Sequence, residues 1–338
     1  MTRIALLAVA VSFVLAGCGG STVAARPTPS ATPGPIGDTW TWDGGTWHQV
    51  ASNGPSPRYL AALAYDSDHQ EYVLFGGHTA TGISDETWEW DGKTWKALSP
   101  AHRPPPRMDA AMAYDPARHV VVLYGGLIPD QSEGAEAGDT WTWDGTDWTE
   151  ADAGPGAPGY RQGPRAVTTP DGLILFGGRM GNVKYYGDAW TWNAKKWTRI
   201  DRDPKPPGRG AAAVAWNPVD STLFVFGGTG LKAGAGPGNL GELLGDAWVL
   251  TNGAWTQLKG SGPPPVANSN GMWDSRSKRA VVMLGMPCPT PSGEAWAWDG
   301  ASWSAAPKPG MSARWGAALA QAPDGSAVLL GGSDEAGC

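Results

Sequence analysis

The chain has 338 residues, among them 49 glycines, 30 prolines and 20 tryptophans, and its formal net charge is −7. An acidic chain of this kind is a poor partner for nucleic acid. Abundant glycine and proline are typical of many short strands joined by turns, and the absence of any long apolar run after the N-terminal one argues against a further membrane segment.

The N-terminus has the features of an exported bacterial protein. Arg3 is followed by the apolar run 4–15, which predicts a signal peptide over residues 1–17, too short for a stable membrane span. The small residues Ala16 and Gly17 before Cys18 resemble the lipobox of bacterial lipoproteins. This resemblance implies acylation of Cys18 and a lipid anchor on the extracytoplasmic side of a bacterial membrane. The alternative is an ordinary secretory signal with an incidental cysteine.

A polar segment separates this signal from the rest of the chain. Residues 18–37 combine Cys18 with a stretch rich in Gly, Ser, Thr, Ala and Pro, in which Arg26 is the only charged residue. This composition predicts a disordered stalk. Removal of residues 1–17 takes away only the charge of Arg3, so the mature chain has a net charge of about −8.

A tryptophan-rich segment recurs six times after the stalk. Each copy begins with an acid, has Trp two residues later and closes with another Trp; five copies have a further Trp in between. The i, i+2 spacing is that of a strand, and Asp-Gly or Asn-Gly pairs predict a hairpin. We therefore expect a tryptophan framework, with sugar stacking by a few exposed rings as the alternative. The copies begin at Asp38, Glu86, Asp139, Asp188, Asp246 and Glu294.

A second recurring unit lies between these hairpins. Its first strand is rich in small residues, and its second is a solid apolar run that ends in a glycine pair such as Gly125-Gly126. In the fifth copy, we take Gly285-Met286 as the counterpart of that pair. The units begin at Arg58, Arg107, Arg165, Arg209, Val266 and Arg314.

The two units together make four strands over about 50 residues, which is the period of a kelch propeller blade. The glycine pair, the aromatic residues after it and the closing Trp resemble the kelch-repeat family over residues 38 to about 332. The resemblance implies an all-β fold, a six-bladed propeller with four-stranded antiparallel blades over residues 38–338. The hairpin 38–50 and the unit 314–332 are both unpaired in sequence, so we expect them to share the closing blade.

The strands of each blade are lettered a to d from the centre outward. The a–b and c–d turns are short, whereas the b–c loops on the opposite face are long and dissimilar, so we expect binding at the b–c and d–a loop face. Arginines begin strand a there and form a candidate ring for an anionic ligand, as the family resemblance also suggests. The alternative is that each pairs with a hairpin acid as a structural ion pair. The candidates are Arg58, Arg107, Arg165, Arg209 and Arg314.

Two cysteines other than Cys18 fall in b–c loops of adjacent blades. In an exported protein Cys288 and Cys338 are predicted to form a disulfide. The five histidines occupy unrelated positions, and no metal site, cofactor motif or catalytic signature is found in the sequence.

These features together predict a membrane-anchored, monomeric propeller that acts as a binding or scaffolding module for a protein or glycan. The first alternative is a carbohydrate-active enzyme, similar to an epimerase or lyase, with its site at the channel mouth. A purely structural role in the cell envelope is a further alternative, because the fold alone permits all three.

Overall fold

The computed structural model describes residues 33–50, 54–129, 135–152, 154, 156–231 and 241–336. The predicted signal peptide, Cys18 and most of the predicted stalk lie outside these residues. Within the described ranges no helix is both long and apolar enough to cross a membrane.

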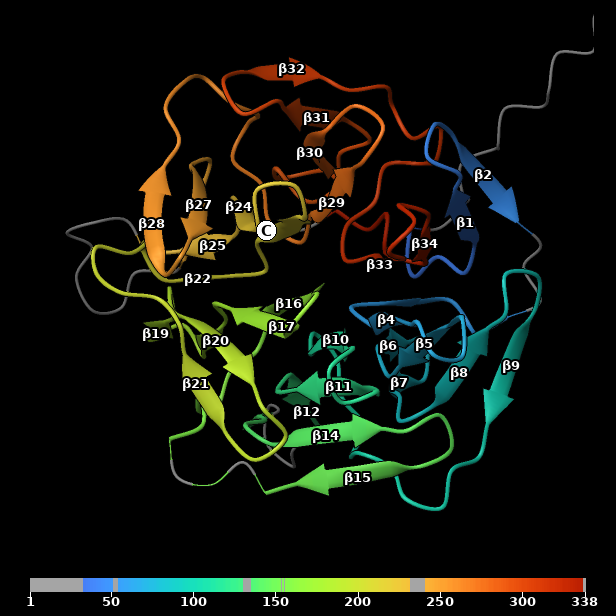
Figure 1. Ribbon diagram of the computed structural model, residues 1–338. Helices are drawn as coiled ribbons and strands as arrows, with labels where there is room; N and C mark the ends of the chain where they lie inside the picture. The colour runs from blue at the N-terminus through green and yellow to red at the C-terminus, as the bar shows by residue number, and fades with distance from the viewer. Residues whose placement is uncertain are drawn as a thin grey trace, which may run out of the picture. The chain divides into compact units, whose positions relative to one another are not determined.

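The described residues form six four-stranded antiparallel sheets arranged around a central axis (Figure 1). Their innermost strands are neighbours around that axis, which confirms the predicted all-β propeller. Blades 1 to 3 are β4 (Ala62–Asp66), β5 (Glu71–Phe75), β8 (Thr87–Trp90), β9 (Trp95–Leu98); β10 (Ala111–Asp115), β11 (Val120–Tyr124), β14 (Thr140–Trp143), β15 (Trp148–Ala151); and β16 (Arg165–Thr169), β17 (Gly172–Phe176), β20 (Ala189–Trp192), β21 (Trp197–Arg199). Blades 4 and 5 are β23 (Ala213–Asn217), β24 (Thr222–Phe226), β27 (Ala247–Thr251), β28 (Ala254–Gln257); and β29 (Asn270–Asp274), β30 (Arg279–Met283), β31 (Ala295–Trp298), β32 (Trp303–Ala305).

The sixth blade joins the two ends of the described chain, as the unpaired units in the sequence predict. Its strands are β33 (Ala318–Gln321), β34 (Ala327–Leu330), β1 (Thr39–Trp42) and β2 (Trp47–Val50). Strand β1 pairs with β34, with Thr39 opposite Leu330 and Trp42 opposite Ala327. The ring is therefore closed by hydrogen bonds between strands nearly 300 residues apart, which leaves neither β1 nor β34 as an exposed edge.

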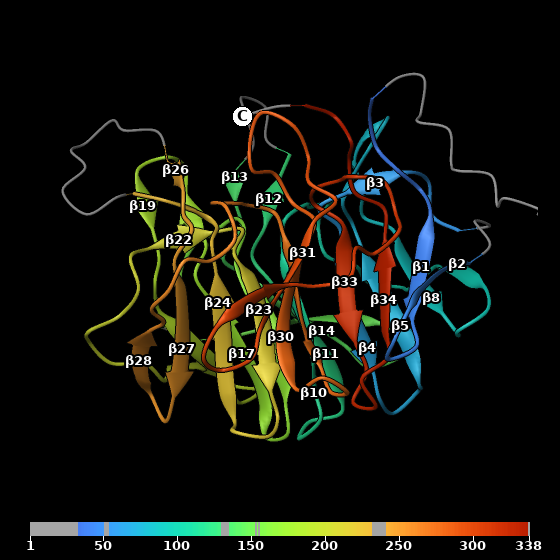
Figure 2. The ribbon, with the colours of Figure 1, turned by 90° about the horizontal axis from the view of Figure 1, so that it is seen from above.

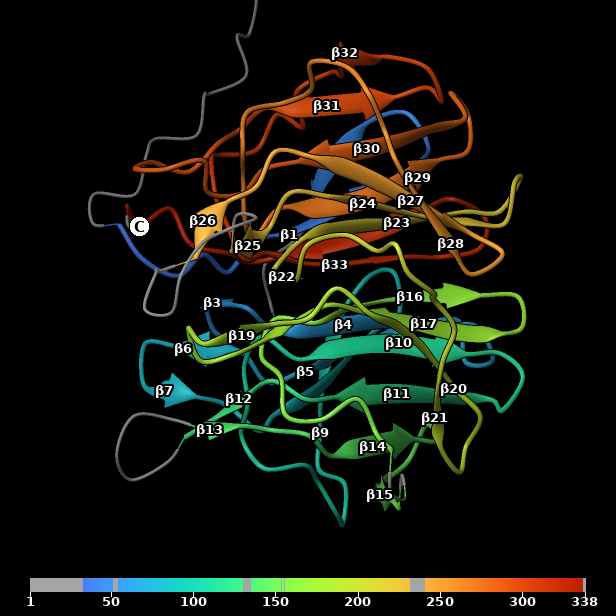
Figure 3. The same cartoon turned by 90° about the vertical axis from the view of Figure 1, so that its left-hand side faces the viewer.

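Short extra strands mark the face that carries the b–c loops. They lie beyond the blade ends on one side of the ring, opposite the a–b turns (Figure 2, Figure 3). This is the loop-rich face that the sequence predicts. The strands are β3 (Arg58–Tyr59), β6 (His78–Thr79), β7 (Gly82–Ile83), β12 (Leu127–Ile128), β13 (Ala135–Glu136), β18 (Arg179–Met180), β19 (Lys184–Tyr185), β22 (Arg209–Gly210), β25 (Thr229–Gly230) and β26 (Glu242–Leu243).

Tryptophan pairs hold five of the six c–d hairpins together. Trp143 lies directly opposite Trp148, their ring centroids are 5.4 Å apart, and each side chain is 1 % exposed. Tilted aromatic pairs of this kind stabilise a hairpin beyond the area they bury. Leu250 takes the inner place opposite Trp255 in blade 4. The buried rings match the structural interpretation of the repeated tryptophans.

The closing tryptophan of each hairpin also binds the preceding blade. The indole of Trp197 donates a hydrogen bond to Thr140 Oγ1 at 2.9 Å and packs edge-on against Tyr124. Trp148 donates in the same way to Thr87 at 3.0 Å. Three such bonds link neighbouring blades. The other three blades have alanine in place of the threonine, at Ala189, Ala247 and Ala295, and so cannot accept this bond.

The predicted glycine pair of the fifth unit is wrong by one residue. Gly77 donates its N–H to the carbonyl of Arg107 at 2.9 Å, and Gly285 makes the same bond to Arg314 at 2.8 Å. Gly285 is therefore the second member of the pair, and Leu284 is the first, with a φ of 60°. A non-glycine residue in that conformation costs free energy, so this junction is the least regular of the six.

Cys288 is disulfide-bonded in the structure. Its predicted partner, Cys338, lies outside the described residues, so the pairing of these two cysteines stays a prediction.

We expect Thr140→Val to destabilise the propeller by about 1–3 kcal/mol, because the indole N–H of Trp197 would lose its partner inside the interface. The measurement is the urea midpoint of unfolding followed by near-UV circular dichroism. Thr149→Val is the matched control, since Thr149 is exposed on β15 and its replacement should change stability by less than about 0.5 kcal/mol. Equal midpoints for the two variants would contradict the proposed role of the bond.

Candidate functional site

Four of the five candidate arginines are buried in ion pairs within their own blades. Arg107 is 1 % exposed; its Nη1 and Nη2 lie 2.7 and 2.8 Å from the two carboxylate oxygens of Asp139. Nη1 also donates to the carbonyl of Gly125 at 3.0 Å. Arg209 repeats this geometry with Asp246, while Arg58 pairs with Glu86 and Arg314 with Asp38.

The same carboxylate also accepts the indole N–H of the first hairpin tryptophan. Trp141 Nε1 donates to Asp139 at 2.7 Å, and Trp248 Nε1 donates to Asp246 at 2.6 Å. One acid therefore joins the start of strand a, the end of strand b and the start of strand c. This geometry supports the structural alternative, because the four guanidinium groups do not reach the surface on which a ligand would bind.

Burial and hydrogen bonding act in opposite directions on these acids. Burial alone would raise the pKa of Asp139, but hydrogen bonds from Arg107 and Trp141 and the charge of Arg107 lower it below the usual 3.8. The pKa of Asp246 is lowered for the same reasons by Arg209 and Trp248. The acids therefore stay ionised at neutral pH and keep their arginines paired.

Arg165 is not the fifth member of this set; Arg161 is. Arg161 is fully buried, donates to the carbonyl of Gly177 at 2.8 Å and pairs with Asp188 at 2.9 Å. The sequence prediction took Arg165 for the counterpart of Arg107. A better signal was the sequence separation between the buried arginine and the first glycine of the pair. It is 18 residues in three blades and 16 for Arg161.

A closed ring of backbone hydrogen bonds surrounds the channel at the loop-rich end. Six residues, one before each innermost strand, have φ between 51° and 65°, and the N–H of each donates to the carbonyl of its neighbour. The N···O distances are 2.7–3.1 Å. The ring narrows the channel at this end to the space inside six peptide groups. Its members are Leu60, Asp109, Gly163, Ala211, Asn268 and Gly316.

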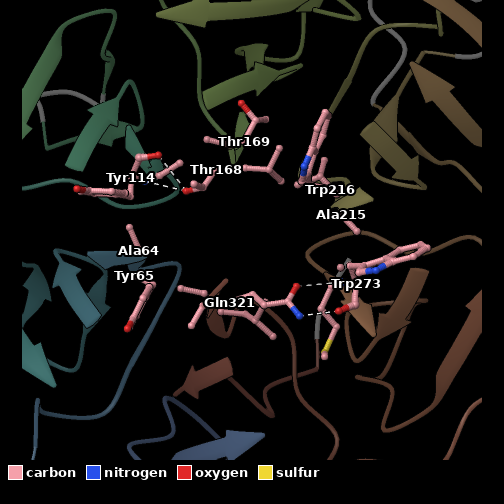
Figure 4. Close-up of a pocket in the computed structure, with 18 of the residues that line it drawn as sticks. Ala64, Tyr65, Tyr114, Thr168, Thr169, Ala215, Trp216, Trp273 and Gln321 are labelled. Atoms are coloured by element: carbon pink, nitrogen blue, oxygen red, sulfur yellow. Dashed lines mark hydrogen bonds between the residues drawn. The ribbon is translucent and has the colours of Figure 1, made fainter. Parts of the chain in front are cut away.

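The channel widens below the ring into a cavity of about 420 Å³ that all six innermost strands and the a–b turns line. This cavity lies toward the a–b turns, away from the loop-rich face that the sequence prediction favoured. Aromatic side chains at its wall point outward from its centre, as Figure 4 shows for Tyr65, Tyr114, Trp216 and Trp273.

Two polar side chains that line the cavity bind the backbone of the neighbouring innermost strand. Thr168 Oγ1 accepts from the backbone N–H of Tyr114 at 3.1 Å and donates to its carbonyl at 3.0 Å. The Gln321 amide pairs in the same way with the backbone of Trp273 (Figure 4). These contacts satisfy backbone groups that have no strand partner.

Arg165 crosses the channel between the cavity and the ring. Its Nη1 lies 2.9 Å from Asp109 Oδ1, and its Nη2 lies 3.5 Å from Asn268 Oδ1, so one side chain connects blades 2, 3 and 5. Arg165 lines both the larger cavity and a second one of about 90 Å³ next to the ring.

Two large apolar side chains are exposed on the loop-rich face. Tyr160 is 64 % exposed just before Arg161, and Val183 is 76 % exposed in the β18–β19 hairpin. Tyr186 lies next to Tyr160, because its hydroxyl donates a 3.3 Å hydrogen bond to the Tyr160 carbonyl, and Lys184 Nζ lies 4.8 Å from the Tyr186 ring centroid. Val219, 64 % exposed, lies in an a–b turn on the opposite face. The described residues contain no group of three or more His, Cys, Asp or Glu side chains placed to hold a metal ion.

We expect Asp139→Asn to destabilise the fold by about 3–5 kcal/mol at neutral pH, because Arg107 would be left as a buried unpaired charge. The pKa of Asp139 is lowered on folding, so its contribution is complete above the unfolded value of about 3.9. That contribution should disappear as the pH falls below 3.8, through the folded pKa, and the gap between wild type and variant should close.

Urea unfolding at several pH values between neutral and strongly acidic provides the measurement. Glu150→Gln is the control, since Glu150 is exposed on β15 and its replacement should leave the unfolding free energy unchanged at neutral pH. A gap for Asp139→Asn that stays constant on acidification would contradict the ion-pair account.

Comparison with known families agrees with this architecture. The family model that describes the KLHDC2/KLHL20/DRC7 Kelch-repeats domain matches residues 38–228 and, in a second register, residues 91–285. No curated protein matches the chain. The repeats that the model covers contain the buried arginines, the glycine pairs and the tryptophan hairpins described above. The chain belongs to the kelch-repeat family, and its propeller is of the kind that serves as a protein-binding module.

Proposed function

We propose that this chain is a lipid-anchored, extracytoplasmic kelch propeller that binds a protein partner through its loop-rich face. The observation that carries the proposal is the exposure of Tyr160 and Val183, both in loops of blade 3 on the loop-rich face; together with Tyr186 and Lys184 we call these residues the patch. Aromatic residues are enriched at protein interfaces, because they bury a large area at a low cost in conformational entropy.

The patch is built on a rigid support. Tyr186 stacks against the buried guanidinium of Arg161, 3.9 Å from its ring centroid, and Glu136 accepts a 2.7 Å hydrogen bond from the N–H of Gly181. The hairpin of blade 3 is thus attached to the b–c loop of blade 2. A surface that is ordered before binding loses less entropy when a partner docks.

The enzyme alternative receives less support from the described residues. A glycan-processing site at the channel would need an acid or base facing the substrate, but no carboxylate lines the larger cavity among these residues. A glycan ligand remains an outcome to be tested, since the patch has aromatic rings on which a sugar could stack.

The point at which the chain enters the propeller fits a short tether. Gly34 and Asp334 exchange hydrogen bonds, and the N–H of Ile36 donates to Gly332, so the first described residues lie at the loop-rich face. Residues 18–33 would reach at most roughly 55 Å when extended. A partner on or near the same membrane is therefore within reach.

We expect Cys18→Ala to release the protein from the membrane fraction, because the acylation site is lost. Fractionation of cells followed by immunoblotting measures this release, with Cys288→Ala as the control that keeps the anchor. Membrane association of Cys18→Ala would contradict the lipid anchor without affecting the binding proposal.

The binding proposal is tested with the mature chain carrying Cys18→Ala, immobilised and exposed to an envelope extract, with a glycan array in parallel. Val183→Asp should abolish capture of the protein that wild type retains, because the charge enters the apolar centre of the patch. Val219→Asp, equally apolar and exposed on the other face, should capture it normally. Capture that depends on Val219 and not on Val183, or binding to the glycan array alone, would contradict the proposal.

A further inference from the structure

Arg165 differs from the other candidate arginines because its side chain faces a cavity. Its side chain is 22 % exposed, whereas that of Arg107 is 1 % exposed. It is the only charged residue among those that line the larger cavity in the described part of the chain. In the equivalent place four blades have an alanine, as at Ala62, Ala111 and Ala213, and blade 5 has Asn270. The ring of blades does not require an arginine here.

One side of the Arg165 guanidinium retains free hydrogen-bond donors. Nη1 is occupied by Asp109 at 2.9 Å and by the Pro164 carbonyl at 3.1 Å. Nη2 has only the 3.5 Å contact to Asn268, and Nε has no partner among the described residues. Nε and Nη2 form the pair of parallel donors that suits a planar carboxylate.

Two further polar groups beside Arg165 are unpaired. The Ser269 hydroxyl, on a side chain 4 % exposed, and the Asn270 amide nitrogen have no hydrogen-bond partner in the described structure. Both residues line the same two cavities as Arg165. Buried polar groups without a partner are costly, so a ligand that accepts hydrogen bonds here would recover part of that cost.

The remainder of the cavity is suited to an apolar body. Its wall on the a–b turn side of Arg165 includes Ala113, Val214, Ala215 and Ala320, and its volume of about 420 Å³ is typical of small-molecule sites. The ring of six peptide groups narrows the loop-rich end. A ligand would therefore enter from the a–b turns.

We propose that the central cavity binds a small organic carboxylate. Its carboxylate pairs with Nε and Nη2 of Arg165, and its apolar body packs against the alanine and valine wall. This site is independent of the protein-binding patch, because the two open on opposite faces of the ring.

The test uses isothermal titration calorimetry on the mature chain carrying Cys18→Ala. The probes are acetate, hexanoate, benzoate and 4-phenylbutyrate, with 4-phenylbutyramide as the neutral match of the last. The longer carboxylates should bind, and 4-phenylbutyrate should bind at least about tenfold more tightly than its amide. No binding by any carboxylate in the series, or equal affinities for acid and amide, would overturn the proposal.

Two variants move the affinity in opposite directions. Asp109→Asn removes a competing negative charge beside the guanidinium, so carboxylate affinity should rise several-fold while amide affinity stays constant. Asparagine fits this position, because Asn268 holds the equivalent place in the peptide ring with a similar φ. The double variant Asp109→Asn, Arg165→Ala removes the ion pair as a unit and should abolish the preference for the acid.

Arg179→Ala is the matched control, since Arg179 begins a hairpin on the loop-rich face. It should leave both affinities unchanged. Circular dichroism and melting temperature establish that each variant is folded. A double variant that keeps the acid preference, or an Arg179→Ala variant that loses it, would overturn the assignment of the site.

Discussion

The buried ion pair at the start of five of the six blades is the interaction on which the propeller depends. An arginine before strand a binds the carbonyl of the first glycine and a carboxylate at the start of strand c, as Arg107 does with Gly125 and Asp139. Five blades have this junction. In blade 5 the arginine is replaced by Val266, and Glu294 pairs instead with the exposed Lys308. The irregular Leu284 lies in the same blade. Blade 5, which lacks the arginine, therefore also differs in the pairing of its acid and in its glycine pair. This is expected, because the acid would be an unpaired charge if it stayed buried without an arginine.

This junction decides which charges remain for function. Four of the predicted arginines are buried in ion pairs. The loop-rich face therefore does not present the ring of cationic side chains that their positions in the sequence predict. The face offers instead an aromatic and apolar patch on blade 3, while the peptide ring narrows the channel beneath it. The two faces therefore differ in kind: one has projecting hairpins suited to a large partner, and the other has a recessed cavity suited to a small one.

Much of the fold could be predicted from the sequence, because tryptophan spacing and glycine pairs report local strand geometry. The closing blade followed from the order of the two units along the chain. The cavity could not be predicted, since it depends on residues about 50 positions apart that meet at the axis. The peptide ring was equally hidden: Leu60 and Ala211 adopt a conformation that favours glycine. Arg165 was taken for the arginine that begins the unit, whereas the spacing to the glycine pair identifies Arg161.

Comparison of the six copies with one another separates residues that build the ring from residues that are free to do something else. Where the copies agree, as in the arginine, acid and glycine of the junction, the geometry accounts for the residue fully. Strand a carries Tyr65, Thr168, Trp216 and Gln321 at one equivalent position, and alanine, Asn270 or Arg165 at another. Packing at the axis is satisfied by alanine, so an arginine there must overcome the cost of partial burial. Asp109 offsets that cost only in part, since the Nε of Arg165 has no partner in the part of the chain that the structure describes. Arg165 departs from the repeat. It is for this reason better evidence for a binding site than any residue that the repeat itself requires.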